Sequence, residues 1–249
     1  EKVDRMHMKN RLLQAAIVIL GFTAFALANP VTVVFQSGGP TATNGNPPES
    51  YSPYTMTVNG STVTVACDDF VDHVTDGETW TADINKFTFN ASNQVTGLTG
   101  GLYYNDSTPA LQASTTQEYE EAAYLFYQFN GAGNSNAAIN YAIWDIFDPN
   151  AASVPPPDGS AYWESQAASN FGSLSLTQLQ DFAIYTPDTW DVAKYGPNGE
   201  TWPDNGRPQE MLGEVPEPAT LALLGTGLLG LAVVFKRRLH EGVDMDSQA

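Results

Sequence analysis

One uncharged apolar run constrains this 249-residue chain more than any other feature. Residues 219–235 form 17 consecutive positions without a charged side chain, which is the short end of the length that crosses a bilayer as a helix. Lys236, Arg237 and Arg238 follow at once, and such a basic cluster stays on the cytoplasmic side of a membrane. The sequence therefore predicts a transmembrane helix, with residues 239–249 as a cytoplasmic tail and the preceding chain on the opposite side.

The residues on both sides of this run form an ordered signature. Val215, Pro216, Glu217 and Pro218 precede the run, and the prolines mark its outer boundary because a helix interior does not tolerate them. A glutamate between two prolines, then an apolar span, then an arginine-rich stop resembles the PEP-CTERM sorting signal over residues 215–238. A plain C-terminal membrane anchor is the alternative.

The resemblance implies a route and a partner. It implies export by a bacterium with two membranes, recognition within the membrane by an exosortase, and cleavage near the Pro-Glu-Pro tripeptide. The protein would be anchored in the inner membrane in transit and then reach the cell surface or the extracellular matrix. The same motif has also been labelled an ice-binding protein C-terminal domain, a label that implies no ice binding by this chain.

The N-terminal end carries a matching export signal. Lys9 and Arg11 precede an apolar run over residues 12–27, and Ala26-Leu27-Ala28 supplies the small residues of a cleavage site. Residues 1–28 are therefore predicted to be a secretory signal peptide with an upstream extension. An N-terminal membrane anchor is the alternative.

The body between the two ends is strongly acidic. Residues 29–215 contain only three Lys or Arg against 22 Asp or Glu. Phosphate backbones and anionic lipid repel such a body, so we expect no nucleic-acid partner. The body is long enough for one domain with a hydrophobic core. It contains no Gly-rich phosphate-binding loop, and we expect no cofactor.

The first half of the body is predicted to be β-rich. Apolar and polar residues alternate on both sides of Asn59-Gly60, which predicts a hairpin over residues 54–66 with a type I′ turn. Further strands are expected at residues 31–35, 79–90 and 97–104.

The second half has helical periodicity. Helices are expected at residues 116–129, 135–147, 161–171 and 175–183, the last of them capped by Ser175. Together the two halves predict a single compact α+β domain over residues 29–185. Residues 186–214, rich in Pro and Gly, are predicted to form a stem between this domain and the sorting signal.

Cys67 is the only cysteine of the chain, so an intramolecular disulfide is excluded. It ends a predicted strand, and Asn140 and Trp144 share one face of a predicted helix. This combination resembles the thioester domains of bacterial surface adhesins, in which a cysteine thiol condenses with a glutamine side chain and the thioester then acylates a partner. Asn140 stands in the glutamine position with a side chain one methylene shorter. A small buried cysteine and a buried asparagine that anchors the strand end are the alternatives.

Asp68, Asp69 and Asp72 begin an acidic cluster directly after Cys67. Converging carboxylates are calcium ligands, which makes these residues weak calcium candidates. Their spacing is not that of an EF-hand loop, so a solvated acidic turn is the favoured interpretation. His73 is the only histidine in residues 29–215, which disfavours histidine-rich metal sites and a Ser-His-Asp triad.

These features predict a non-enzymatic, exported surface or matrix protein that passes through the exosortase system. Its expected partners are the export machinery, the exosortase, the membrane through its C-terminal helix, and extracellular polysaccharide or biofilm. A covalent thioester adhesin that uses Cys67 is one alternative, and a polysaccharide-acting hydrolase is the other.

Overall fold

The computed structural model describes residues 30–39, 50–70, 74–106, 111–148, 158–188 and 208–216. All of these residues belong to one compact unit that runs from Asn29 to Pro216. The predicted signal peptide, transmembrane helix and tail lie outside the described residues. Within the described ranges, no helix is both long enough and apolar enough to cross a membrane.

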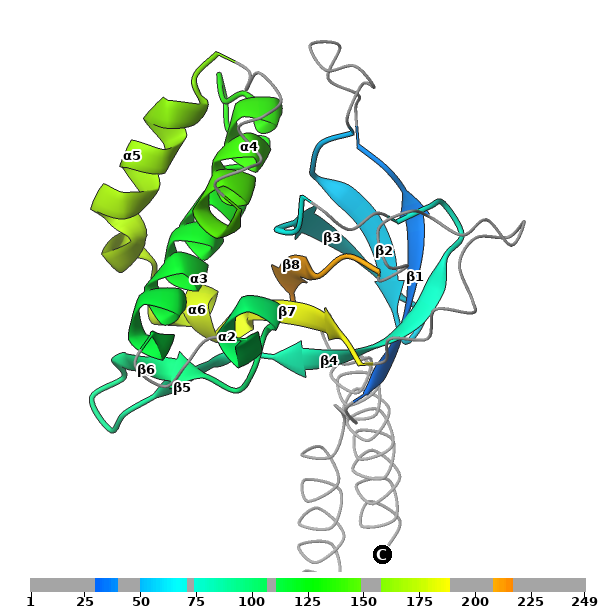
Figure 1. The fold of residues 1–249 in the computed structure, drawn as a ribbon, viewed down its shortest axis with the longest axis horizontal. Coiled ribbons are helices and arrows are strands. Elements are labelled where there is room, and N and C mark those ends of the chain that lie inside the picture. Colours follow the sequence, from blue (N-terminus) through cyan, green and yellow to red (C-terminus); the bar gives the residue numbers. More distant parts are fainter. Residues whose placement is uncertain are drawn as a thin grey trace, which may run out of the picture. The chain divides into compact units, whose positions relative to one another are not determined.

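Six antiparallel strands close into a barrel in the order β1-β2-β3-β8-β7-β4 (Figure 1). The strands are β1 Val31–Ser37, β2 Tyr54–Val58, β3 Ser61–Cys67, β4 Thr79–Asn85, β7 Phe182–Pro187 and β8 Met211–Glu214. Strand β8 comes last in the sequence and lies between β3 and β7. Because the described barrel is closed, its strands present no open edge for the addition of another strand.

The β2–β3 hairpin confirms the predicted turn. Asn59 and Gly60 have positive φ angles of 48° and 83°, as both central residues of a type I′ turn require. Val58 pairs with Ser61 across the turn. Every second side chain of β2 is buried, because alternate positions of a strand point to opposite faces.

A layer of helices packs beside the barrel (Figure 1). The helices are α2 Leu102–Asp106, α3 Gln112–Phe126, α4 Asn136–Phe147, α5 Ser160–Asn170 and α6 Leu176–Asp181, with a 3-10 turn at Phe171–Ser173. A small hairpin of β5 Phe87–Phe89 and β6 Val95–Leu98 connects β4 to α2. Helix α3 contacts the barrel at β8, α4 contacts it at β3, and α5 packs on both helices.

Two of the helices begin at serine caps. The Ser135 side chain accepts a hydrogen bond from the Ala138 N–H at the start of α4. Ser175 and Gln178 form a reciprocal capping box at the start of α6, which confirms Ser175 as the predicted cap. These side chains satisfy backbone N–H groups that have no partner within the first turn of a helix.

The end of β3 and most of β7 are buried on both faces, whereas Thr62 and Thr64 of β3 are exposed. Val65 of β3 belongs to the core inside the barrel, while the next residue, Ala66, packs among the helices. On β7, Tyr185 likewise belongs to the core inside the barrel, and its neighbour Ile184 packs among the helices. On the other side of the barrel, β1, β2 and β4 have one buried face and one more exposed face. The helical layer therefore covers only part of the barrel wall.

The structure corrects the predicted stem. The sequence places residues 186–214 outside the domain, but Thr186 and Pro187 end strand β7, and residues 211–214 form strand β8. The compact unit accordingly extends to Pro216 instead of ending at residue 185. Residues 189–207 of the predicted stem lie outside the described residues.

Of two further predicted strand regions, one differs from the structure. The strand region expected at residues 79–90 consists of two strands, β4 and β5, with Lys86 between them. The strand expected at residues 97–104 is replaced by the end of β6 and by the short helix α2. Gly97 within β6 and Gly101 directly before α2 have φ angles of 158° and 147°, which glycine adopts readily.

Candidate functional site

The structure brings together the three residues singled out in the sequence around the cysteine. Cys67 ends β3, Asn140 and Trp144 lie on α4, and all three are buried. The Asn140 side-chain amide donates to the Cys67 backbone carbonyl at 3.2 Å, and its oxygen accepts from the Ser52 N–H. The Ser52 hydroxyl in turn accepts from the Cys67 N–H at 3.0 Å. Asn140 thus fixes the end of β3 to the helical layer.

The Cys67 thiol is held in its neutral form. Burial raises the pKa of the Cys67 thiol, the nearby Asp69 and Asp68 raise it further, and the Trp144 side chain acts in the opposite direction. The sulfur donates to the Asp69 carbonyl at 2.8 Å. Because the thiolate is the nucleophilic form of cysteine, the raised pKa lowers the nucleophilicity of Cys67 at neutral pH.

Trp144 forms the wall beside this thiol. The centroid of its ring lies 4.9 Å from that of Tyr141 and 5.1 Å from that of Phe70, and both contacts are edge-on. Such aromatic contacts add to the stabilisation that comes from burial alone. The residues around Cys67 are therefore packed as a core, although the thiol and the Asn140 carboxamide lie at one junction.

The first two residues of the acidic cluster are not solvated, whereas Asp76, further along the same cluster, is exposed in a turn as the favoured interpretation expects. Asp68 is fully buried and Asp69 is 3% exposed, because β3 carries them under the helical layer. Asp72 and His73 lie outside the described residues. In the described part of the chain, no group of three or more His, Cys, Asp or Glu side chains is arranged to hold a metal ion.

Glu210 is the main site residue that the sequence analysis missed. It directly precedes β8, is fully buried, and accepts hydrogen bonds at both carboxylate oxygens. The Leu102 N–H donates to one oxygen at 2.7 Å, and the Tyr119 hydroxyl donates to the other at 2.5 Å. The Thr186 hydroxyl is a third donor. Glu210 therefore links β8 with α2, α3 and β7.

Asp68 and Glu210 form a buried carboxyl pair. Cys67 pairs with Met211 across β3 and β8, so the next residues, Asp68 and Glu210, lie opposite each other. Neither oxygen of Asp68 has an N–H or hydroxyl donor among the described residues, so the neighbouring Glu210 carboxylate is its polar partner. Burial and the Glu210 charge raise the pKa of Asp68. Burial also raises the pKa of Glu210, but the hydrogen bonds that it accepts lower it. Asp68 therefore keeps the proton and donates it to the Glu210 carboxylate.

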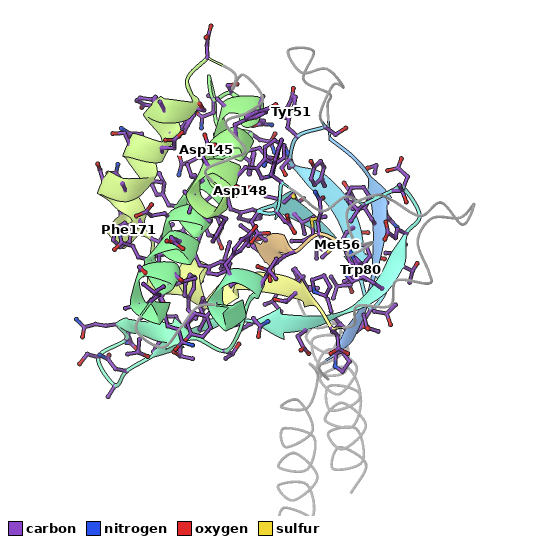
Figure 2. The ribbon with its side chains drawn as sticks, in the orientation of Figure 1. Tyr51, Met56, Trp80, Asp145, Asp148 and Phe171 are labelled. Atoms are coloured by element: carbon purple, nitrogen blue, oxygen red, sulfur yellow. The ribbon has the colours of Figure 1, made fainter. Side chains whose placement is uncertain are left out.

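A second acidic cluster lies outside the barrel, where Asp145 of α4 meets Glu164 of α5. Asp145 and the nearby Asp148 lie in the helical layer (Figure 2). Partial burial, the charge and hydrogen bond of Glu164, and the charge of Asp148 raise the pKa of Asp145 to about 6. Two carboxyl groups in contact resist simultaneous ionisation, which explains the direction of the shift.

The residues that begin the predicted sorting signal are continuous with the fold. Val215 is partly buried against the barrel core, and its N–H donates to the Asp181 carbonyl at 2.8 Å. Pro216 is the last described residue of the unit. The other sorting residues, Glu217, Pro218 and residues 236–238, lie outside the described residues.

A family model for the PEP-CTERM protein-sorting motif matches residues 214–238. The chain carries a PEP-CTERM sorting motif. This finding confirms the resemblance seen in the sequence, and the motif implies export, anchoring in the membrane during transit, and processing by an exosortase. Glu214, the last residue of β8, is also the first residue of the PEP-CTERM motif. Comparisons with curated proteins and with solved structures gave no match.

Proposed function

We propose that this chain is a non-enzymatic cell-surface or extracellular-matrix protein whose barrel domain is exported through the PEP-CTERM system. The observation that carries the proposal is the sorting motif at residues 214–238, continuous with the last strand of the domain. In this account the C-terminal segment holds the domain at the membrane until an exosortase processes it. The domain then remains on the surface or in the matrix, associated with extracellular polysaccharide.

The position of the titratable groups supports a non-enzymatic role. Asp68, Glu210 and Cys67 all have a raised pKa at the barrel–helix junction, and all three are completely buried. A catalytic acid, base or nucleophile must come within hydrogen-bonding reach of its substrate. The perturbed groups at this junction are instead used to join elements of the fold.

The net negative charge of the domain favours one class of polysaccharide as its partner. A body with 22 acidic and three basic residues is repelled by anionic polymers at low ionic strength. We therefore expect association with a neutral polysaccharide. Co-sedimentation of the full-length protein in detergent with a neutral and an anionic exopolysaccharide tests this choice. Retention by the anionic polymer alone would contradict it.

Export and processing are tested by expressing the full-length chain in cells with and without an exosortase. We expect the protein to leave the membrane fraction only when the exosortase is present. The variant Glu217→Gln should stay in the membrane fraction, while Glu241→Gln, outside the matched motif, should behave as wild type. Identical distribution of wild type in both strains would refute the proposal.

A covalent adhesin is the second candidate, because Asn140 and Cys67 meet at one buried junction. In that reaction the Cys67 sulfur attacks the Asn140 amide carbon, a C–S bond forms, the C–N bond breaks, and the thiol proton leaves with the nitrogen as ammonia. The product would be lighter by one ammonia and would take up methylamine, whereas Cys67→Ser would not. A full mass, with a thiol that titrates after unfolding, would eliminate this function.

A further inference from the structure

Strand β8 is the short element through which the domain leads into its sorting motif. It pairs with β3 over three residues and with β7 over four. Its last residue, Glu214, begins the motif. A strand of this length is held by few backbone hydrogen bonds, so its stability depends on the contacts of neighbouring side chains.

The strongest of these contacts is made by Glu210, the residue directly before β8. Its carboxylate receives hydrogen bonds from the Leu102 N–H, the Tyr119 hydroxyl and the Thr186 hydroxyl. The fourth donor is the carboxyl of Asp68, which directly follows β3 and lies opposite Glu210, because Cys67 and Met211 are paired in the strand register. Of these four donors, only the Asp68 carboxyl loses its proton within the ordinary pH range, because backbone amides and aliphatic hydroxyls do not titrate there and tyrosine titrates near pH 10.

The other titratable groups that face the carboxyl pair offer no positive charge. They are Cys67 and Asp69 beside Asp68, Tyr103 on α2 and Tyr119 on α3. Each of these is either neutral or negative. In the described part of the chain, the single proton of Asp68 is therefore what keeps two negative charges from facing each other inside the fold.

We propose that the Asp68–Glu210 pair is a proton-dependent latch on strand β8. With its one proton, the pair holds β8 in the barrel and keeps Glu214–Pro216 against the domain. When the proton leaves, two buried carboxylates repel each other, β8 detaches from β3 and β7, and the start of the sorting motif is released from the fold.

The direction of the pH dependence follows from the raised pKa of Asp68. A carboxyl whose pKa is higher in the folded state binds its proton more tightly there than in the open state. Its contribution is fully present below the ordinary pKa of about 3.9, and it is lost as the pH rises through the raised value. The latch is therefore closed in acid and opens toward alkaline pH.

Hydrogen exchange of the full-length protein in detergent micelles tests the latch. The backbone amides of residues 211–214 are followed from pH 5 to pH 9, with rates corrected for the intrinsic pH dependence of exchange. Between the ordinary pKa of about 3.9 and the raised pKa of the closed pair, the population of open β8 should rise about tenfold per pH unit, because opening then releases one proton. Above the raised pKa the rise should level off, because the closed pair has already lost its proton. Corrected rates that stay flat over the whole range would overturn the proposal.

Three variants make the test specific. Asp68→Asn keeps an N–H donor for Glu210 and has no proton to lose, so its corrected rates should stay low and flat. Thr186→Val removes one donor but leaves the pair, so β8 should open more at every pH with the wild-type slope. Asp158→Asn, at an exposed position, should follow wild type. A wild-type slope in Asp68→Asn, or the loss of the slope in Thr186→Val, would refute the latch.

Discussion

The side-chain amide of Asn140 donates a hydrogen bond to the backbone carbonyl of Cys67, 73 residues earlier in the chain. The bond joins helix α4 to the end of strand β3, where the barrel meets the helical layer. The carboxylate of Glu210 makes the second such joint, between β8, β7 and helices α2 and α3. Two buried polar side chains thus hold together the two parts of the α+β domain.

Asn140→Ala should lower the free energy of unfolding by about 3 kcal/mol, because it leaves the Ser52 N–H and the Cys67 carbonyl buried without their partner. Asn136→Ala removes a half-buried asparagine of the same helix, whose two hydrogen bonds with Asn130 are exposed to solvent. It should cost about 0.5 kcal/mol or less. Urea denaturation measures both values, and similar losses for the two variants would contradict the role of Asn140.

Tyr119→Phe should cost about 2 kcal/mol, since it removes a buried hydrogen bond to the charged Glu210 carboxylate. Tyr124→Phe is the matched control on the same helix, because the Tyr124 hydroxyl is not a donor to Glu210. Its effect should stay within about 0.5 kcal/mol. Chemical denaturation at constant pH provides the comparison, and equal stability of Tyr119→Phe and wild type would show that Glu210 does not need this donor.

Gly213→Ala tests the close contact between β8 and β3. An added methyl group would lie 2.9 Å from the Val65 side chain and 3.0 Å from the Thr64 carbonyl oxygen. Because a backbone oxygen within a paired strand cannot rotate away as a side chain can, we expect the free energy of unfolding to fall by about 1–3 kcal/mol. A methyl group at Gly172 meets no atom within 4 Å, so Gly172→Ala should leave the melting temperature nearly unchanged. Equal melting temperatures for both variants would argue against β8 as a closing strand.

The Asp145–Glu164 contact predicts a pH dependence. The pKa of Asp145 is raised to about 6, so its stabilising contribution is fully present below its ordinary pKa of about 3.9 and is lost as the pH rises through about 6. Carbon-13 NMR of the Asp145 carboxyl should show this titration. In Glu164→Gln the pKa should move toward the ordinary value, because the facing charge is gone. An unchanged Asp145 pKa in that variant would exclude Glu164 as a cause.

Elements specified by local signals could be predicted from the sequence. Asn59-Gly60 specifies its own turn type through the φ angles that these residues tolerate, and Ser175 caps α6 within one helical turn. The exposed outer face of β2 gives its sequence the alternation of a half-buried strand. In each case the information lies within a few residues of the element itself.

Strands β7 and β8 were missed because their environment is non-local. Five consecutive residues of β7, and the first three of β8, are buried, so neither strand alternates in polarity and the pattern of β7 merges with that of a helix. The pairing of β8 with β3 spans more than half of the chain. Because the predicted stem excluded Glu210 from the domain, its burial was not predicted. The local signal of that burial is the position of the acid beside the apolar pair Met211-Leu212.

Cys67 and Asn140 show the opposite case. The sequence resemblance to a thioester pair predicts that these two residues lie together. In the structure the Asn140 side chain donates a hydrogen bond to the Cys67 backbone carbonyl. Their chemistry does not follow from proximity, because the Asn140 amide also serves the Ser52 N–H and burial holds the Cys67 thiol neutral. Polar partners can be inferred from motifs, whereas protonation depends on the surrounding packing.

The mass of the mature protein tests most directly the claim that an exported barrel is processed at its sorting motif. The protein should be recovered from cells that contain an exosortase and from cells that lack it, and its C-terminal peptide identified by mass spectrometry. We predict that the exosortase removes a C-terminal segment and leaves β8 complete through Pro216, while the other strain retains the full C-terminus. An identical, uncut C-terminus in both strains, or an end before Met211, would contradict the account.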